Sequence, residues 1–139
     1  TQEDINWAAR TLYGEFGSYK SIYQEITAWV IRNRLNSGRW GDTYKEVVTA
    51  RRQFSCFNKK DPNYARVMKP NIKSKAWKRA VANATKVLNA PDSDNPIPDI
   101  MFYYSPRSMT PPGGIPTWAV GRETIDIEGI NSWHMTLVE

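Results

Sequence analysis

Apolar residues recur at helical spacing near the start of the chain, and one acidic residue continues their row. The row consists of Ile5, Ala8, Leu12 and Glu15, which are three or four residues apart, as on one face of a helix. Thr1 and Asp4 have the spacing of a capping box, which marks the start of this helix. Gly14 and Gly17 indicate that the helix ends or bends close to Glu15.

Two more helices are predicted before residue 51. Over residues 21–35 the apolar positions occur on several sides of the expected helix, so we expect it to be buried, and Ser37-Gly38 ends it. Thr43 and Glu46 form another capping box, which opens a short helix that continues through Ala50.

The most regular amphipathic pattern begins at Ser74 and continues to Leu88. The polar side of this predicted helix consists mainly of Lys75, Lys78, Arg79, Asn83 and Lys86. We expect these side chains to face water, because the opposite side is apolar.

The remaining patterns predict short extended elements. Residues 53–57 contain two phenylalanines with small residues between them, as in a short strand or an extended turn, and residues 100–105 predict a buried strand. The tail from residue 130 to 137 alternates, with His134 on its polar face. Helices followed by short strands predict an α+β fold, and the chain length suits a single domain over residues 1–139.

Composition narrows the class of protein. Hydrophobic residues make up 40% of the 139 positions, with six Trp and seven Tyr, which favours a packed globule over a disordered chain. The net charge of +5 is compatible with an anionic polymer as partner, be it nucleic acid, cell wall or membrane surface. No apolar stretch is long enough for a membrane span, and no signal peptide opens the given chain.

Several kinds of site are disfavoured by the residue counts. Cys56 is the single cysteine, so no disulfide forms within the chain, and its flanks do not resemble a thiol protease. One cysteine and one histidine without ligand spacing make no zinc site, and no glycine-rich phosphate loop occurs. We therefore expect no metal and no cofactor.

Glu15 is the strongest candidate for chemistry. A carboxyl group among apolar side chains loses hydration, which raises its pKa toward the value that a general acid needs near neutral pH. The alternative from periodicity alone is a helix-end glutamate that pairs with Arg10, Lys20 or Arg32. Periodicity does not decide between these two interpretations.

Short motifs in a fixed order resemble the cell-wall hydrolase family typified by spore cortex-lytic enzymes. They are Leu12-Tyr13-Gly14-Glu15, Ala28-Trp29-Val30-Ile31-Arg32-Asn33-Arg34, Ser37-Gly38-Arg39 with Asp42-Thr43, Gln53-Phe54-Ser55-Cys56, Ala80 with Val87-Leu88, Phe102-Tyr103-Tyr104-Ser105-Pro106, Trp118 and His134. Together they cover nearly the whole chain. Phe16-Gly17-Ser18 departs from the family, which commonly has a small residue and a second acidic position after its glutamate.

The resemblance implies a lysozyme-like fold, mainly helical, with a small antiparallel sheet beside the catalytic helix. It implies that Glu15 protonates the oxygen between N-acetylmuramic acid and N-acetylglucosamine in peptidoglycan. The family looks more like lytic transglycosylases, which leave an anhydro sugar, than like muramidases that use water. Such an enzyme acts on the cell wall, whether it is secreted, periplasmic or delivered by a phage as an endolysin, or serves spore cortex lysis.

A hydrolase of this kind normally needs a second carboxylate at a defined distance from the acid. Asp42 looks like a residue at a helix start, Asp61 precedes Pro62 in a turn, and Glu25 is expected on a wet helix side. Since each has a structural interpretation, a mechanism with Glu15 alone as acid and base is favoured.

Five further residues are candidates for substrate binding: Gln53, Ser55, Tyr104, Trp118 and His134. Gln53 and Ser55 offer hydrogen bonds to an N-acetyl or hydroxyl group, or else belong to a satisfied polar turn. Tyr103 and Tyr104 alternate in one strand, so one is expected in the core and Tyr104 is favoured for the cleft. Trp118 is either a platform for a sugar ring or a plug of the core.

Two functions from other classes remain as alternatives. One is a basic nucleic-acid-binding module, because Lys73, Lys75, Lys78, Arg79 and Lys86 follow one helix. The other is an inactive cell-wall-binding domain. We expect peptidoglycan glycan strands as the partner, no nucleic acid, and a monomer.

Overall fold

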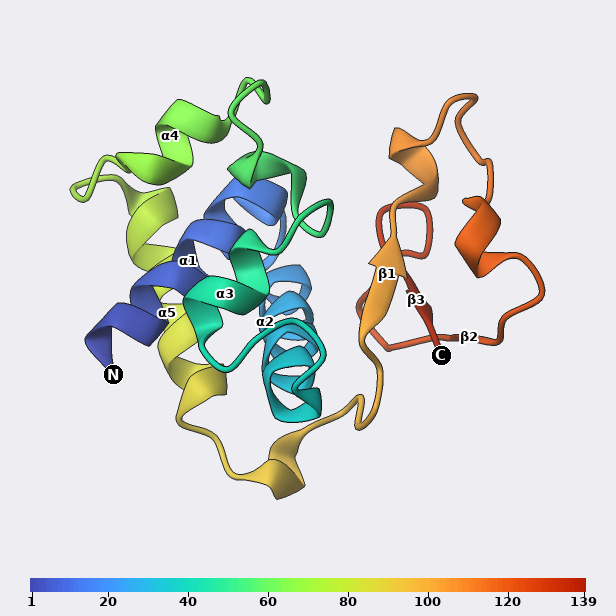
Figure 1. Ribbon diagram of the computed structural model, residues 1–139, viewed down its shortest axis with the longest axis horizontal. Helices are drawn as coiled ribbons and strands as arrows, with labels where there is room; N and C mark the ends of the chain where they lie inside the picture. The colour runs from blue at the N-terminus through green and yellow to red at the C-terminus, as the bar shows by residue number, and fades with distance from the viewer. The chain divides into compact units, whose positions relative to one another are not determined.

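Helices make up the first part of the chain, and short strands the last part (Figure 1). The computed structural model describes residues 1–139, which form two compact units, residues 1–96 and residues 97–139. The first unit contains α1 (Gln2–Phe16), α2 (Ser21–Ser37), α3 (Tyr44–Thr49), α4 (Tyr64–Met68) and α5 (Lys75–Leu88), with 3-10 turns η1 (Ser55–Phe57) and η2 (Asp92–Asp94). The second contains β1 (Phe102–Tyr104), β2 (Thr124–Ile125) and β3 (Thr136–Val138), with turns η3 (Pro106–Ser108) and η4 (Thr117–Ala119).

The predicted mainly helical α+β fold with a small antiparallel sheet is confirmed. The placement of that sheet beside the helix that carries Glu15, and the single domain over residues 1–139, stay predictions. None of the five α-helices combines the length and apolar character that a membrane crossing needs.

The predicted start and end signals of the helices are confirmed. The Thr1 hydroxyl accepts a hydrogen bond from the Asp4 N–H at 3.1 Å, as expected for a capping box, and α1 ends at Phe16. Helix α2 is buried on several sides and extends two residues beyond the predicted end. It stops at Gly38, whose φ of 72° is a left-handed conformation that suits glycine.

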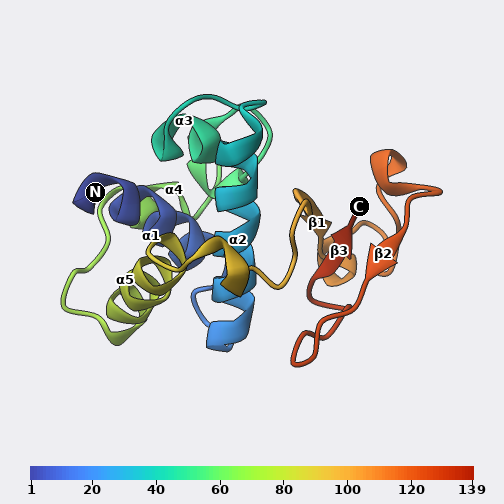
Figure 2. The ribbon, with the colours of Figure 1, turned by 90° about the horizontal axis from the view of Figure 1, so that it is seen from below.

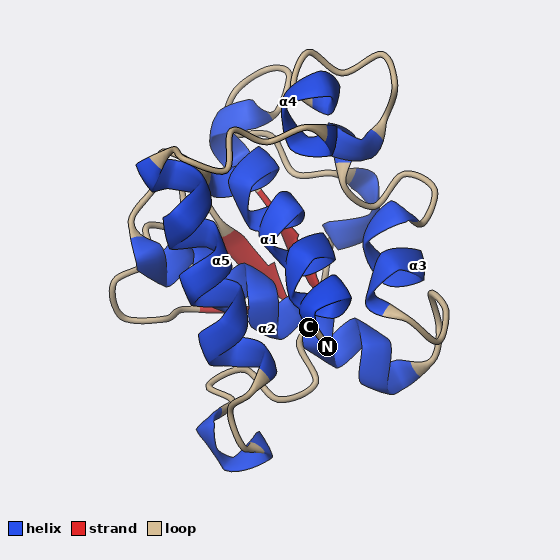
Figure 3. Cartoon of the chain, turned by 90° about the vertical axis from the view of Figure 1, so that its left-hand side faces the viewer, coloured by secondary structure: helices blue, strands red, loops and turns tan.

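Helix α5 lies along α1 and also contacts α2 (Figures 2 and 3). Its apolar face is buried, with Trp77, Ala80, Ala84 and Val87 almost inaccessible to solvent. The prediction that Asn83 faces water is wrong. Asn83 is only 8% exposed, because its side-chain amide donates to Gln24 Oε1 at 2.9 Å in the interior.

Residues 53–57 do not form a short strand, which is one of the two structures predicted for them. Gln53 belongs to a turn, Phe54 is extended, and residues 55–57 form the 3-10 turn η1. Phe54 is buried with the Arg34 guanidinium 5.0 Å from its ring centre, and Cys56 is buried between α1 and α4. Contacts of Phe54 and Cys56 with residues distant in sequence therefore take the place of pairing with another strand. The sequence pattern also did not predict α4.

The second unit is built on a three-stranded antiparallel sheet in the order β1-β3-β2. Strand β1 is shorter than the predicted strand over residues 100–105 and is half-buried rather than buried. Strand β3 covers only residues 136–138, so His134 lies in the turn before it and not on the polar face of a strand. Its N–H donates to Asn131 O at 2.9 Å, which is turn geometry.

Gly14 allows α1 to approach its neighbours closely. A Cβ atom on Gly14 would lie 2.7 Å from Cys56 Cβ, 2.7 Å from Cys56 Sγ and 2.7 Å from Val67 Cγ1. All three distances are far shorter than a van der Waals contact, and both neighbours are buried. The residue before Glu15 must therefore be a glycine for η1 and α4 to pack there.

We predict that Gly14→Ala destabilises the protein by about 1 kcal/mol or more. Alanine favours helices over glycine by about 1 kcal/mol, but overpacking costs about 1 to 3 kcal/mol, and the three contacts of 2.7 Å place this substitution in the upper part of that range. Urea unfolding followed by circular dichroism measures the change. Asn6→Ala, at a half-buried position of the same helix, is the control and is expected to change stability little. Equal stability of Gly14→Ala and wild type would contradict the close packing.

Candidate active site

Glu15 lies in the last turn of α1 and is half-buried. Its carboxyl group makes no hydrogen bond, and the three ion pairs of the protein involve other residues. Arg10 stacks over the Trp7 ring at 4.6 Å, and Lys20 is exposed. The alternative of a paired helix-end glutamate is thus not what the structure contains.

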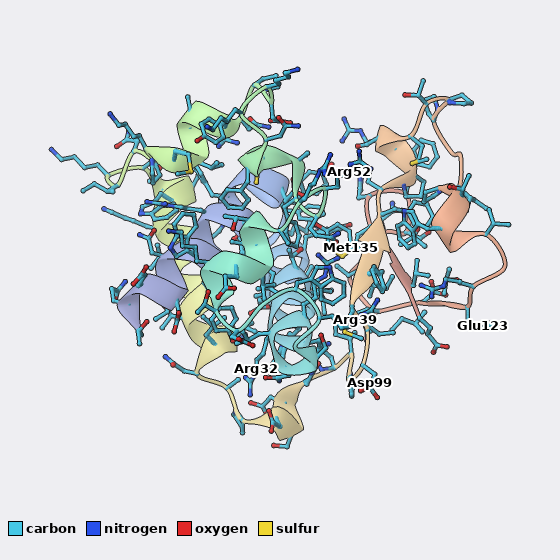
Figure 4. The ribbon with its side chains drawn as sticks, viewed as in Figure 1. Arg32, Arg39, Arg52, Asp99, Glu123 and Met135 are labelled. Atoms are coloured by element: carbon cyan, nitrogen blue, oxygen red, sulfur yellow. The ribbon has the colours of Figure 1, made fainter.

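Arg32, labelled in Figure 4, lies in the second half of α2 and binds residues at the end of α5 and directly after it. Its guanidinium donates to Val87 O at 2.9 Å and to Ala90 O at 2.6 Å, and it pairs with Asp92 at 2.7 Å. These bonds hold the segment after α5 against α2. Arg32 therefore does not supply a counter-charge for Glu15.

Burial raises the pKa of the Glu15 carboxyl group from its ordinary value of 4.5 to about 7, and the negative charge of Asp61 adds to the rise. An acidic residue in the last turn of a helix is also poorly placed, because carbonyl groups converge there. A pKa near 7 means that protonated and ionised forms of Glu15 coexist at neutral pH. This is the state that a group needs if it first donates and then accepts a proton.

Buried amide side chains hold the end of α1. The carbonyl groups in the last turn of a helix lack partners within the helix. Gln24 of α2, which is fully buried, donates from Nε2 to Phe16 O at 3.0 Å, and its Oε1 accepts from Asn83 of α5 at 2.9 Å. The residue after Glu15 is thereby fixed to two other helices.

Two arginines satisfy further carbonyl groups at the same end. Arg79 of α5 donates to Gly17 O at 2.8 Å and to Tyr19 O at 2.6 Å. Arg66 of α4 stacks over the Tyr13 ring at 4.3 Å and donates to Tyr13 O at 3.4 Å. The backbone on both sides of Glu15 is therefore held by tertiary contacts, which restricts where its carboxyl group can point.

Cys56 lies against this end of α1 but is unsuited to act as a nucleophile. Burial raises the pKa of its thiol, and the charges of Glu15 and Asp61 raise it further. A thiol in this state remains protonated at neutral pH, whereas the thiolate is the reactive form. Cys56 is only 1% exposed, so it serves as a small buried hydrophobic residue.

Gln53 and Ser55 flank the buried Phe54 in the segment that leads to Cys56. The Gln53 amide makes one long bond, 3.5 Å to Arg51 O, and the Ser55 side chain is exposed without a hydrogen bond. Both side chains therefore retain hydrogen-bonding capacity that a saturated turn would not have. Their role in substrate binding stays a prediction.

The second unit carries Tyr104, Trp118 and His134. Trp118 is 45% exposed, so it is not a plug of the core. The Tyr104 ring meets it edge-on at 6.1 Å, and Phe102, two residues earlier on the same side of β1, approaches it to 5.6 Å. Tyr103 and Tyr104 are both half-buried, so the expected division into a core residue and a cleft residue does not occur.

The structure also shows features that the sequence pattern did not reveal. The charge of Asp61 raises the pKa of Glu15 although 46 positions separate the two residues, and no pattern in the sequence around either residue predicts this. A pocket of about 420 Å³ between α2 and α5, lined by Ile22, Ile26, Trp29 and Val87 among others, contains none of the predicted site residues. No group of three or more His, Cys, Asp or Glu side chains is arranged to hold a metal ion.

A helical unit with an unpaired carboxyl group of pKa near 7 has the features of an acid–base site. A family model described as Cell Wall Hydrolase matches residues 21–132, which is more than half of the chain, so this chain belongs to the cell wall hydrolase family. Comparison with curated proteins found no match, and neither did comparison with solved structures. Membership supports hydrolysis of peptidoglycan as the general activity. The match begins after Glu15 and does not include that residue.

We predict that the stability of Glu15→Gln relative to wild type rises with pH. Between about pH 4.5 and about pH 7 the unfolded chain releases the Glu15 proton while the folded protein retains it, so wild type loses stability over that window. The variant cannot ionise there, and the difference should grow by up to about 3 kcal/mol and then stay constant. Unfolding free energies across this pH range measure it. Glu3→Gln, at an exposed position of α1, is the control, and a pH-independent difference for Glu15→Gln would contradict the raised pKa.

Proposed function

We propose that the protein cleaves the bond between N-acetylmuramic acid and N-acetylglucosamine as a lytic transglycosylase, with Glu15 as general acid and base. The observation that carries the proposal is the half-buried Glu15 carboxyl group, which lacks any polar partner and has a pKa of about 7. Family membership supports the polymer, and the geometry around α1 supports the residue.

In the proposed reaction Glu15 first donates its proton to the glycosidic oxygen, and the bond from that oxygen to the muramic acid C1 breaks. A hydroxyl group of the same muramic acid then forms a bond to C1 and gives its proton to the Glu15 carboxylate. The products are an anhydro sugar and a free glucosamine hydroxyl, and Glu15 is again protonated. A pKa near 7 suits both steps, because neither form of the carboxyl group is strongly favoured.

The alternative is a muramidase in which a second carboxylate activates water. Asp61 is the one candidate, since it alone among the carboxylates acts on Glu15. Its Oδ1 accepts from the Asn63 N–H at 2.8 Å, as in a turn that the residue itself stabilises. Glu25 pairs with Lys86, and Asp42 is exposed. This structural use of Asp61 favours the single-acid mechanism.

The other predicted site residues complete the proposal. Gln53 and Ser55 bind an N-acetyl or hydroxyl group, Trp118 stacks on a sugar ring with Tyr104 at its edge, and His134 donates to the substrate. The enzyme acts as a monomer, reaches the wall by secretion, in the periplasm or from a phage, and requires no cofactor.

We predict that Glu15→Gln releases soluble fragments from purified peptidoglycan sacculi about a hundredfold or more slowly than wild type. Glutamine keeps the size of the side chain but cannot donate the proton. Mass spectrometry of wild-type products should show fragments one water lighter than reducing muropeptides.

Glu25→Gln is the matched control, because Glu25 lies on the neighbouring helix and only pairs with Lys86. It should digest sacculi as wild type does. Full activity in Glu15→Gln would refute the catalytic assignment, and reducing ends in the products would favour the muramidase. An inactive wall-binding domain would pellet with sacculi and release nothing even as wild type.

We predict that Asp61→Asn moves the alkaline limb of the pH–activity profile to lower pH. The variant lacks the negative charge that raises the Glu15 pKa, so Glu15 loses its proton at lower pH. Profiles of soluble-fragment release measure the shift. Asp126→Asn, at an exposed position of the second unit, is the control and should leave the profile unchanged. Loss of activity at every pH would instead identify Asp61 as the base of a hydrolase.

A further inference from the structure

The charges of the protein are distributed unevenly between its two units. Residues 1–96 contain 17 Lys and Arg and nine Asp and Glu, whereas residues 97–139 contain two and five. The overall charge of +5 therefore results from a strongly basic helical unit and an acidic second unit. A partner that recognises charge should meet the helical unit.

The excess of positive over negative charge is greatest over residues 59–79, which we call the basic segment. Its eight cationic residues are Lys59, Lys60, Arg66, Lys69, Lys73, Lys75, Lys78 and Arg79, and its one carboxylate is Asp61. The segment comprises α4, the loops on either side of it and the first turn of α5, which lie together at one end of the helical unit (Figures 1 and 3). The backbone positions that carry its charges are therefore gathered at that end of the unit.

The arginines and the lysines of the basic segment differ in what they contact. Arg66 and Arg79 donate to backbone carbonyl groups around the end of α1, so both have a structural role in the fold. The six lysines are all exposed, and none of their ammonium groups makes a hydrogen bond or an ion pair. Elsewhere on the same unit, Lys86 does pair, with Glu25.

The arrangement of these lysines opposes stability. Like charges close to one another repel, and Lys75 and Lys78 lie in the first turn of α5, where acidic residues are favoured and none is present. No contact within the protein compensates for this placement. Binding of an anionic partner would compensate for it, and would gain free energy from the repulsion that it relieves.

We propose that the basic segment binds the phosphodiester groups of an anionic cell-wall polymer and so holds the enzyme on the wall. Lysine ammonium groups act as mobile point charges, which suits a flexible chain of phosphates better than it suits bidentate recognition. Single-stranded nucleic acids are bound by cations together with exposed aromatic rings on which the bases stack. The two aromatic residues of the basic segment, Tyr64 and Trp77, are half-buried and buried, so no such platform exists there. This inference does not depend on which residue cleaves the glycan.

The test uses labelled poly(glycerol phosphate) and the full chain with Lys60, Lys69, Lys73 and Lys75 replaced by glutamine. We expect wild type to bind the polymer at about 50 mM salt and to lose most affinity at about 200 mM, because each phosphate contact releases counterions. The variant should bind about tenfold or more weakly and show a shallower dependence on salt. Circular dichroism confirms that each variant is folded.

The matched control replaces Lys20, Lys45, Arg51 and Arg52, four exposed cations of the same unit outside the basic segment, by glutamine. It removes the same net charge and should retain near wild-type affinity. Equal loss in both variants would show that net charge alone matters and overturn the proposal. Tighter binding of single-stranded DNA than of poly(glycerol phosphate) at the same salt would also overturn it, in favour of a nucleic-acid partner.

Discussion

The last turn of a helix ends in carbonyl groups that the helix itself cannot satisfy, and side chains from three other helices donate to carbonyl groups in the last turn of α1 and directly after it. Gln24 of α2, Arg79 of α5 and Arg66 of α4 all donate to the backbone between residues 13 and 19. Gly14 lets η1 and α4 approach the same turn. The packing of the helical unit thus converges on the short segment that contains Glu15.

This convergence also sets the chemistry of the site. The donors that approach the segment are used by backbone carbonyl groups, and none reaches the Glu15 carboxyl group. The carboxyl group is therefore removed from water without being given a partner, which is the condition that raises its pKa. Asp61 adds a like charge in place of a counter-charge, so the same packing that stabilises the helix end raises the pKa of Glu15 to about 7.

The two units offer different surfaces to a polymer. The helical unit presents unpaired lysines around α4, whereas the second unit exposes Trp118 and Trp133, each more than two fifths accessible to solvent. Exposed tryptophan is uncommon, because burying an indole ring is strongly favourable. Cationic groups suit anionic substituents and flat rings suit sugars, and a wall carries both kinds of group.

The sequence by itself determined α1, α2, α3 and α5 of the first unit, the α+β class and the candidacy of Glu15. Those features are local: capping residues, apolar spacing and Gly38 act within a few positions of one another. Tertiary structure alone decided what is not local. It turned residues 55–57 into a 3-10 turn, buried Asn83 against Gln24, and brought Asp61 to act on Glu15. Spacing predicts which face of a helix an acidic residue occupies, but its protonation depends on partners and burial that arise only when distant segments pack together.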